Sequence, residues 1–463
     1  MNRDLSKGPV VKSMILFAIP MILGDLLQQC YNIADTLIVG RFLGEKALAA
    51  VGSTTALINV FVNLFIGISL MTFITSIILG LCMGSSALFS IRFGQRDENG
   101  LKEDICASFF FIAVVTVLLN IIAYVSLDGL RIFLRVPDEV WEAMREYLSV
   151  IFKGILAVFL YNYFTSYLRA IGNSVIPLVF LAASSVLNII LDLWFVIGLE
   201  MGVAGAAQAT VIAQYLSGLG IMIYTFVYYK QVNAILKISC LKKERISKII
   251  SFSMLTCIQQ SVMNLGILMV QGLVNSFGTV VMAAFAAAVK IDAFAYMPVQ
   301  DFGNAFSTFI AQNYGAKEKK RIQQGLKAAV CISAIFCVVI SVFVCIFAKQ
   351  LMMIFVDAKE TAIIMKGVRY LRIEGAFYIG IGWLFLLYGL YRALGRPGMS
   401  VVLTIFSLGT RVALAYVLSA IPAIGVTGIW WSVPIGWALA DIVGLMYYKI
   451  IKKNECEGKS GRY

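Results

Sequence analysis

Two sets of oxygen-bearing side chains interrupt apolar stretches that are long enough to cross a membrane. The first set consists of Gln28, Asn32 and Asp35. The second set consists of Ser184, Asn188 and Asp192. Each spacing places its three side chains on one face of a helix. A charged side chain at the centre of a bilayer costs at least ~2.5 kcal/mol, so it usually faces a cavity or a partner. Two such carboxylates can hold a shared proton or an oxygen-coordinated Na⁺.

Thr210 and Gln214 add a hydroxyl and an amide on one face of the next apolar stretch. Asp192 precedes the connecting turn by about eight residues and Thr210 follows it by about nine, so antiparallel helices place both roughly 12–14 Å from the turn. Asp35 lies roughly 9 Å from the nearer end of its own stretch. We therefore expect Asp35, Asn188, Asp192 and Thr210 to meet in one half of the membrane and to bind a cation.

The composition identifies the elements that position these groups. The 463 residues are 60% hydrophobic and 14% charged, with a mean hydropathy of +0.88, whereas a soluble domain has about 25% charged residues. In lipid, such apolar stretches must be helical. The expected fold is all-α and integral to the membrane, with no cleavable signal peptide. Its twelve predicted spans are residues 13–40, 47–91, 104–126, 147–169, 175–198, 203–229, 247–275, 280–311, 327–347, 368–391, 399–420 and 427–451.

The basic residues predict the orientation of the chain. An even number of spans places both termini on one side, and most of the 38 Lys and Arg fall on that side. The positive-inside rule makes this side cytoplasmic. The net charge of +13 is thus explained by a cell-membrane protein with cytoplasmic termini, and we expect no nucleic-acid partner. The sequence has no His and no paired Cys spacing. We find no catalytic motif, and expect no enzyme, cofactor or bound metal beyond a possible Na⁺ at Asp35 and Asp192.

An internal repeat divides the chain in two. Arg169, Ala170 and Gly172 recur 223 positions later as Arg392, Ala393 and Gly395, and 202-GVAGAA-207 recurs at the same offset as 425-GVTGIW-430. Six spans followed by six similar spans predict two helical bundles related by a pseudo-twofold axis. The predicted parts are an N-terminal lobe (1–229), a cytoplasmic linker (230–246), a C-terminal lobe (247–451) and a cytoplasmic tail (452–463).

The second span does not fit the repeat. From Gly52 to Gly94 there are 42 positions, but the matching stretch from Ala286 to Gly315 has 29. The excess of 13 predicts that this span is unusually long, broken or bulged.

The repeat also provides an internal control for the cation cluster. Asn188 maps to Arg411, Asp192 to Ala415 and Thr210 to Val433, so the fold alone does not require the acidic cluster. The C-terminal lobe has four other intramembrane charges, which we interpret as a structural ion-pair network: Lys290, Asp292, Glu374 and Arg411.

Several stretches in fixed order resemble the MATE (multidrug and toxic compound extrusion) family. They are 32-NIADTLIVGRFLG-44, 167-YLRAIGN-173, 188-NIILD-192 and 281-VMAAFAAAVKIDAFAYMPVQDFGNAFSTFIAQNYGA-316. The resemblance implies a twelve-helix exporter driven by H⁺ or Na⁺ antiport. In the branch similar to the DNA-damage-inducible F proteins, it places cation coupling on Asp35, Asn188, Asp192 and Thr210, and a kink of the first helix at Pro20. The family's other pattern, an acid on the seventh helix, is absent from residues 247–275.

The expected function is export of amphipathic organic cations by alternating access, by a monomer in the lipid bilayer. Tyr161, Tyr163, Phe164 and Trp194 are candidate wall residues, although aromatic residues in spans more often face lipid or the core. One alternative is a lipid-linked oligosaccharide flippase of the same superfamily, which calls for a basic cavity. Another is a receptor or structural membrane protein, which needs neither duplicated lobes nor paired intramembrane carboxylates.

Overall fold

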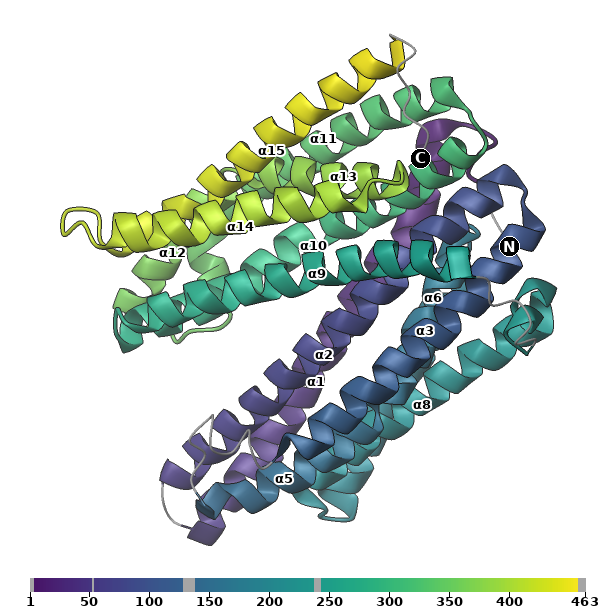
Figure 1. Ribbon diagram of the computed structural model, residues 1–463. Coiled ribbons are helices and arrows are strands. Elements are labelled where there is room, and N and C mark those ends of the chain that lie inside the picture. Colours follow the sequence, from purple (N-terminus) through teal and green to yellow (C-terminus); the bar gives the residue numbers. More distant parts are fainter. Residues whose placement is uncertain (1–3, 52–53, 128–137, 237–242, 457–463) are drawn as a thin grey trace. The chain divides into compact units, whose positions relative to one another are not determined.

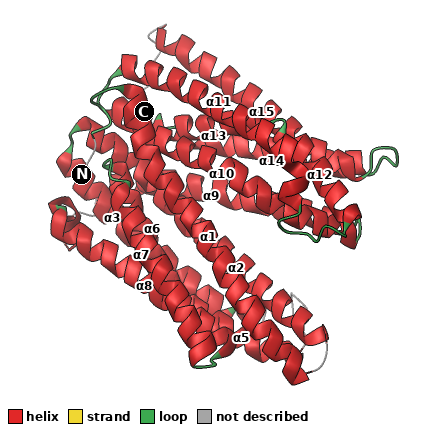
Figure 2. Ribbon diagram, turned by 180° about the vertical axis from the view of Figure 1, so that it is seen from behind, coloured by secondary structure: helices red, strands yellow, loops and turns green. Residues whose placement is uncertain are grey.

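The computed structural model describes residues 4–51, 54–127, 138–236 and 243–456, and the side chains of residues 32–51, 54–70, 138–144, 203, 243, 268 and 454–456 lie outside this description. The regular structure of the described residues is helical throughout (Figures 1 and 2). These residues form two compact units. Of the described residues, unit 1 comprises residue 4 and those between 19 and 257, and unit 2 comprises residues 5–18 and 258–456.

Unit 1 is built on the first half of the chain. Its elements are α1 (Val10–Val51), α2 (Thr54–Gln95), α3 (Glu98–Val125), α5 (Asp138–Lys153), α6 (Ile155–Ala170), α7 (Val175–Asp192), a π-helical segment (Leu193–Gly198), α8 (Gly202–Tyr228) and a 3₁₀ segment (Lys230–Leu236). Its core is aromatic: Phe89, Phe109 and Phe159 surround Tyr163 with ring centroids 5.2–6.3 Å apart. The ring faces and edges of this cluster hold α2, α3 and α6 together.

Unit 2 is built on the second half. Its elements are α9 (Lys243–Asn275), α10 (Thr279–Gly315), α11 (Lys319–Met352), α12 (Thr361–Gly375), α13 (Tyr378–Ala393), α14 (Pro397–Ser419) and α15 (Val426–Cys456). Its largest buried side chain is Trp430, which stacks on Phe285 at 5.4 Å and meets the edge of Tyr370 at 4.9 Å. These three rings join α10, α12 and α15.

The predicted all-α membrane fold is confirmed. Within the described residues, 11 helices are long and apolar enough to cross a membrane, or 12 if α12 and α13 count as one span bent by 52°. The sequence predicted one span over 368–391, and the structure adds a bend just after Gly375. Likewise, the span predicted over 147–169 is divided between α5 and α6 at Gly154.

The second span is long but unbroken along its backbone. α2 is one 42-residue helix and its counterpart α10 has 37 residues. α1 also has 42 residues and ends at Val51, beyond the predicted end at residue 40. At 1.5 Å per residue, α1 and α2 are each about 63 Å long, roughly twice the thickness of the hydrocarbon core.

The backbone repeats where the sequence repeats. Gly172 and Gly395 both adopt positive φ, at 86° and 78°, and so do Gly202 and Gly425, at 65° and 54°. The first glycine of each repeat ends a helix with equivalent backbone hydrogen bonds. Gly172 N donates to Arg169 O in the first repeat, and Gly395 N donates to Arg392 O in the second. This helix ending requires a left-handed residue, which explains why glycine recurs there.

The compact units differ from the predicted lobes in two places. The predicted boundary lies at residues 230–246, whereas unit 1 continues through the first half of α9 to Cys257. Residues 5–18, predicted in the N-terminal lobe, belong to unit 2. Thus α1 and α9, the first helices of the two repeats, each pass from one unit into the other.

Candidate functional site

The predicted cation cluster is centred on the helices α7 and α8 of unit 1. Asn188 and Asp192 are 1% and 0% exposed, so α7 directs both side chains into the unit. The Asn188 amide Nδ2 donates to Thr210 Oγ1 of α8 at 3.4 Å. Asn188 Oδ1 is buried without a hydrogen-bond partner among the described residues. The structure therefore brings Asn188 and Thr210 together, with Asp192 one helical turn further along α7.

Local sequence explains where α7 begins. Gly172 supplies the left-handed turn after α6, and Asn173 Oδ1 then accepts a hydrogen bond from Ile176 N at 3.2 Å. This contact satisfies one of the free N–H groups at the start of the helix. Pro177 lies in the first turn, where a missing N–H has no cost. The start of α7 thereby fixes the register of Asn188 and Asp192.

Asp192 stands at a change of helix type. α7 ends at Asp192, and residues Leu193–Gly198 continue as a π-helix, with Leu199 N bonded to Trp194 O at 2.9 Å. Segments of π-helix are rare and occur often at functional sites. The wider turn changes the direction of the side chains that follow Asp192. Trp194 is 57% exposed, which places its ring outside the core of unit 1.

The first polar stripe is described only in part. Gln28 is exposed on α1, and the side chains of Asn32 and Asp35 lie outside the described residues. Pro20 is inside α1 and half-buried. It lacks an N–H and its ring presses on the preceding turn, so α1 has a built-in weak point five residues before Asp25.

The supporting residues of the second stripe differ in burial. Ser184 is half-buried, whereas its neighbour Ser185 is buried and its Oγ has no hydrogen-bond partner among the described residues. Gln214 is half-buried and its Oε1 faces Gly154, where a Cβ would lie 2.6 Å away. Gln214 thus packs against the break between α5 and α6.

The candidate wall residues divide between core and periphery. Phe164 and Tyr163 are buried in unit 1, and the Tyr163 hydroxyl donates to Ile105 O at 2.7 Å. Both have structural roles. Tyr161 is half-buried, and its hydroxyl donates to Pro177 O at 3.3 Å.

The charges of unit 2 form a second buried polar group. Asp292 and Glu374 are 5% and 1% exposed, and the Tyr378 hydroxyl donates to Asp292 Oδ1 at 2.6 Å. Glu374 Oε2 is buried without a hydrogen-bond partner among the described residues. Arg411 is half-buried and interacts electrostatically with both acids. Lys290 is exposed, so it does not share this site.

Sequence reasoning missed several buried or half-buried charged residues. Asp25 of α1 faces Arg169 of α6, with Oδ1 and Nη2 4.0 Å apart. In the second repeat, the equivalent Arg392 is 6% exposed and donates to Asn304 Oδ1 at 3.2 Å. Asp441 of α15 is also buried. The recurrence of Arg169 as Arg392 identified the internal repeat, but gave no signal for the partners of these two arginines.

Comparisons with known proteins agree over most of the chain. A family model described as MatE matches residues 20–194 and 253–417. The probable multidrug resistance proteins YoeA and YpnP of Bacillus subtilis are 28% and 29% identical, over 97% and 96% of this chain and 96% of each relative. A solved MOP-superfamily transporter from Pyrococcus furiosus, described as having a binding pocket of reverse polarity, has a TM-score of 0.86 at 22% identity, covering 97% of both chains.

Proposed function

Because the chain belongs to the MatE family, we propose that it is a secondary active multidrug exporter. It antiports amphipathic organic cations against H⁺ or Na⁺, and the cation couples through Asp35, Asn188, Asp192 and Thr210 of the N-terminal half. The support for export comes from the family and from relatives with multidrug resistance names. The support for this site comes from Asp192.

The observation that carries the proposal is the burial of Asp192 within a candidate membrane span. Its side chain is 0% exposed, one turn from the Asn188–Thr210 contact and at the start of a π-helix. A carboxylate buried within a membrane span is costly unless polar neighbours, a cation or a proton compensate its charge. Carboxylate, amide and hydroxyl oxygens are ligands for Na⁺ as well as proton acceptors, so the same groups serve either ion.

Coupling requires that the cation change the conformation of the protein. Cation binding lowers the free energy of whichever conformation holds the acid cluster together, and only that differential affinity shifts the equilibrium. In our proposal, α1 bends at Pro20 when the cluster is occupied, which displaces the organic cation. The protein acts as a monomer in the cell membrane with both termini in the cytoplasm, and needs no further cofactor.

Efflux from proteoliposomes tests this function. We would load a fluorescent organic cation such as ethidium and impose an H⁺ or a Na⁺ gradient separately. The proposal predicts export under one of the gradients and about tenfold slower export for Thr210→Val, since the Asn188 amide loses its partner. Thr225→Val is the matched control, because Thr225 lies on the same helix and bonds only to Ile221 O of its own backbone in the described contacts.

The remaining outcomes distinguish the alternatives. If the wild type moves no organic cation under either gradient, the exporter proposal is refuted. Movement of an anionic, lipid-linked substrate would then support the flippase, for which the buried arginine Nε atoms of Arg169, Arg392 and Arg411 offer positive charge. Transport of neither class would favour a receptor or structural role.

A further inference from the structure

The two helices that pass between units are each fixed at their first residues. α1 begins in unit 2 and enters unit 1 at Ile19, while α9 begins in unit 1 and enters unit 2 at Ile258. Since α1 and α9 are the first helices of the two repeats, they occupy equivalent places in the chain. The contacts that hold the start of each helix lie within a single unit.

In unit 2, the start of α1 is held by the turn between α10 and α11. The guanidinium of Arg321 donates to the carbonyl oxygens of Gly8 at 2.8 Å, Leu5 at 3.0 Å and Lys7 at 3.3 Å. Its Nε donates to Asn313 Oδ1 at 2.9 Å. One side chain therefore donates to three carbonyl groups within residues 5–8, just before α1 begins. This task suits the fixed fork of an arginine.

Two buried amides complete this contact, which we call the unit 2 anchor. Asn313 Nδ2 donates to Leu5 O at 3.2 Å, and Leu5 N donates to Gln312 Oε1 at 3.0 Å. Asn313, Gln312 and Leu5 are all 0% exposed. Met14 and Phe17 are buried beyond them, so the first turns of α1 are packed as well as hydrogen-bonded.

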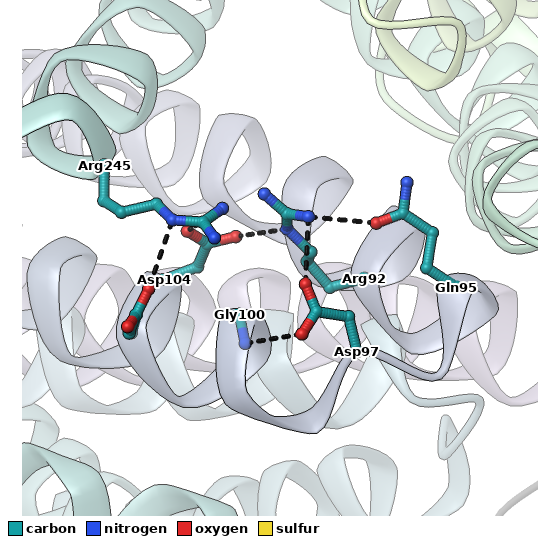
Figure 3. A network of polar contacts seen from close by, with 7 residues as sticks. Arg92, Gln95, Asp97, Gly100, Asp104 and Arg245 are labelled. Atoms are coloured by element: carbon teal, nitrogen blue, oxygen red, sulfur yellow. Dashed lines mark hydrogen bonds and ion pairs between the residues drawn. The ribbon is translucent and has the colours of Figure 1, made fainter.

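In unit 1, the start of α9 is held by the turn between α2 and α3. Arg245 Nε lies 3.2 Å from Glu103 Oε2, and its Nη1 lies 3.9 Å from Asp104 Oδ1. Arg92 of α2 lies 3.1 Å from the other oxygen of Asp104 and 3.1 Å from Asp97. Figure 3 shows the guanidinium groups of Arg245 and Arg92 directed toward one another with carboxylate between them. We call this set the unit 1 anchor.

The two anchoring turns are equivalent in the repeat. Arg96 and Lys317, 221 positions apart, both have positive φ, at 57° and 60°. Asp97 and Glu318 follow them as the N-caps of α3 and α11. Equivalent turns thus hold the start of α9 in unit 1 and the start of α1 in unit 2. Carboxylates make the contacts in unit 1, and a guanidinium with two amides makes them in unit 2.

We propose that these two turns position α1 and α9 for transport, and that release of the anchors accompanies the change between access states. Neither anchor includes a residue of the acid cluster. Each one fixes the start of a helix whose later residues belong to the other unit, so a change in the position of that start requires the anchor contacts to break. The inference concerns helix position, and it holds for either coupling ion and for any substrate.

Distances between spin labels within unit 2 test the proposal. Labels at Lys12 of α1 and Cys331 of α11, both exposed, report whether the start of α1 stays on α11 in protein whose other cysteines are replaced. In lipid nanodiscs, Arg321→Gln is expected to raise the population of a second, longer distance about tenfold over wild type. Lys320→Gln is the matched control, since it removes one charge from an exposed neighbour.

A conservative variant guards against simple misfolding. Arg321→Lys keeps the charge but loses the fork, so its distances should resemble those of Arg321→Gln more than those of wild type. In efflux assays, the Arg321 variants should change the maximal rate while leaving the substrate concentration for half-maximal rate within about twofold. Wild-type distance distributions for both Arg321 variants would overturn the proposal. If the wild type exports no substrate, the proposed function is refuted, but the distance measurements on the Arg321 variants still test the anchor.

Discussion

Replacing Gly84 by alanine is expected to destabilise the packing of α9 in unit 1. A Cβ at Gly84 would lie 2.5 Å from Phe252 O and 2.6 Å from Ser253 Cα, both on the α9 backbone. Since carbon contacts settle at about 3.5–4.0 Å, the two helices must separate by roughly 1 Å. Such overpacking costs about 1–3 kcal/mol.

Two further terms adjust this cost. The adjacent hydrogen bond between Ser85 Oγ and Ser253 Oγ, 2.9 Å long, would stretch and lose about 0.5–1.5 kcal/mol. Alanine regains about 1 kcal/mol of helix propensity over glycine. The net expectation is a loss of about 1–3 kcal/mol, or roughly 2–10 °C in apparent Tm for a unit of this size.

Thermal unfolding in detergent measures this loss, with a second glycine as the control. Gly409 of α14 has nothing within 4 Å of its Cβ position, so Gly409→Ala should leave the apparent Tm unchanged or raise it. Gly80→Ala should repeat the loss, because its Cβ would lie 2.6 Å from Cys257 Cα one turn along α9. If Gly84→Ala and Gly409→Ala have the same apparent Tm, α9 does not approach α2 as closely as the structure shows.

Two other variants test the packing of unit 2. Tyr378→Phe leaves Asp292 Oδ1 buried without its 2.6 Å donor and should lower the free energy of unfolding by about 1–3 kcal/mol. Tyr416→Phe, at an exposed position, is its control. Equal apparent Tm values for the two variants would refute the contact. Trp430→Ala, at a 1% exposed position, should lower the free energy of unfolding by about 3–5 kcal/mol. Trp194→Ala, at a 57% exposed position, should change the apparent Tm little. A larger drop in Tm for Trp194→Ala than for Trp430→Ala would contradict the assigned core.

The sequence predicted the repeated elements well because their signals are local. R-A-x-G and G-V-x-G required glycine at the same two turns of each half, and the positive φ values at Gly172, Gly202, Gly395 and Gly425 give the reason. The end of α1 was predicted too early for an equally local reason. The predicted span ended at residue 40, just before the charged residues Arg41, Glu45 and Lys46. Leu, Glu, Lys and Ala are nevertheless strong helix formers, and the helix continues to Val51.

Contacts between distant residues were beyond such patterns. The Tyr378 hydroxyl donates to Asp292, which lies 86 residues away in the sequence. The sequence of a membrane span does not distinguish a tyrosine that donates a hydrogen bond from one whose ring faces lipid. Counting from a turn placed Asp192 and Thr210 at one depth, but only the structure identifies Asn188 as the partner of Thr210. The anchors at Arg321 and Arg245 were counted merely as cytoplasmic charge.

The central claim is that Asp192 couples substrate export to a cation gradient, and separating exchange from accumulation tests it most directly. In proteoliposomes, substrate counterflow needs no cation gradient, whereas accumulation against a concentration difference does. We predict that Asp192→Asn retains counterflow but loses gradient-driven accumulation, because the neutral side chain can neither take up a proton nor balance Na⁺. Accumulation by Asp192→Asn at the wild-type rate under the same gradient would contradict the account.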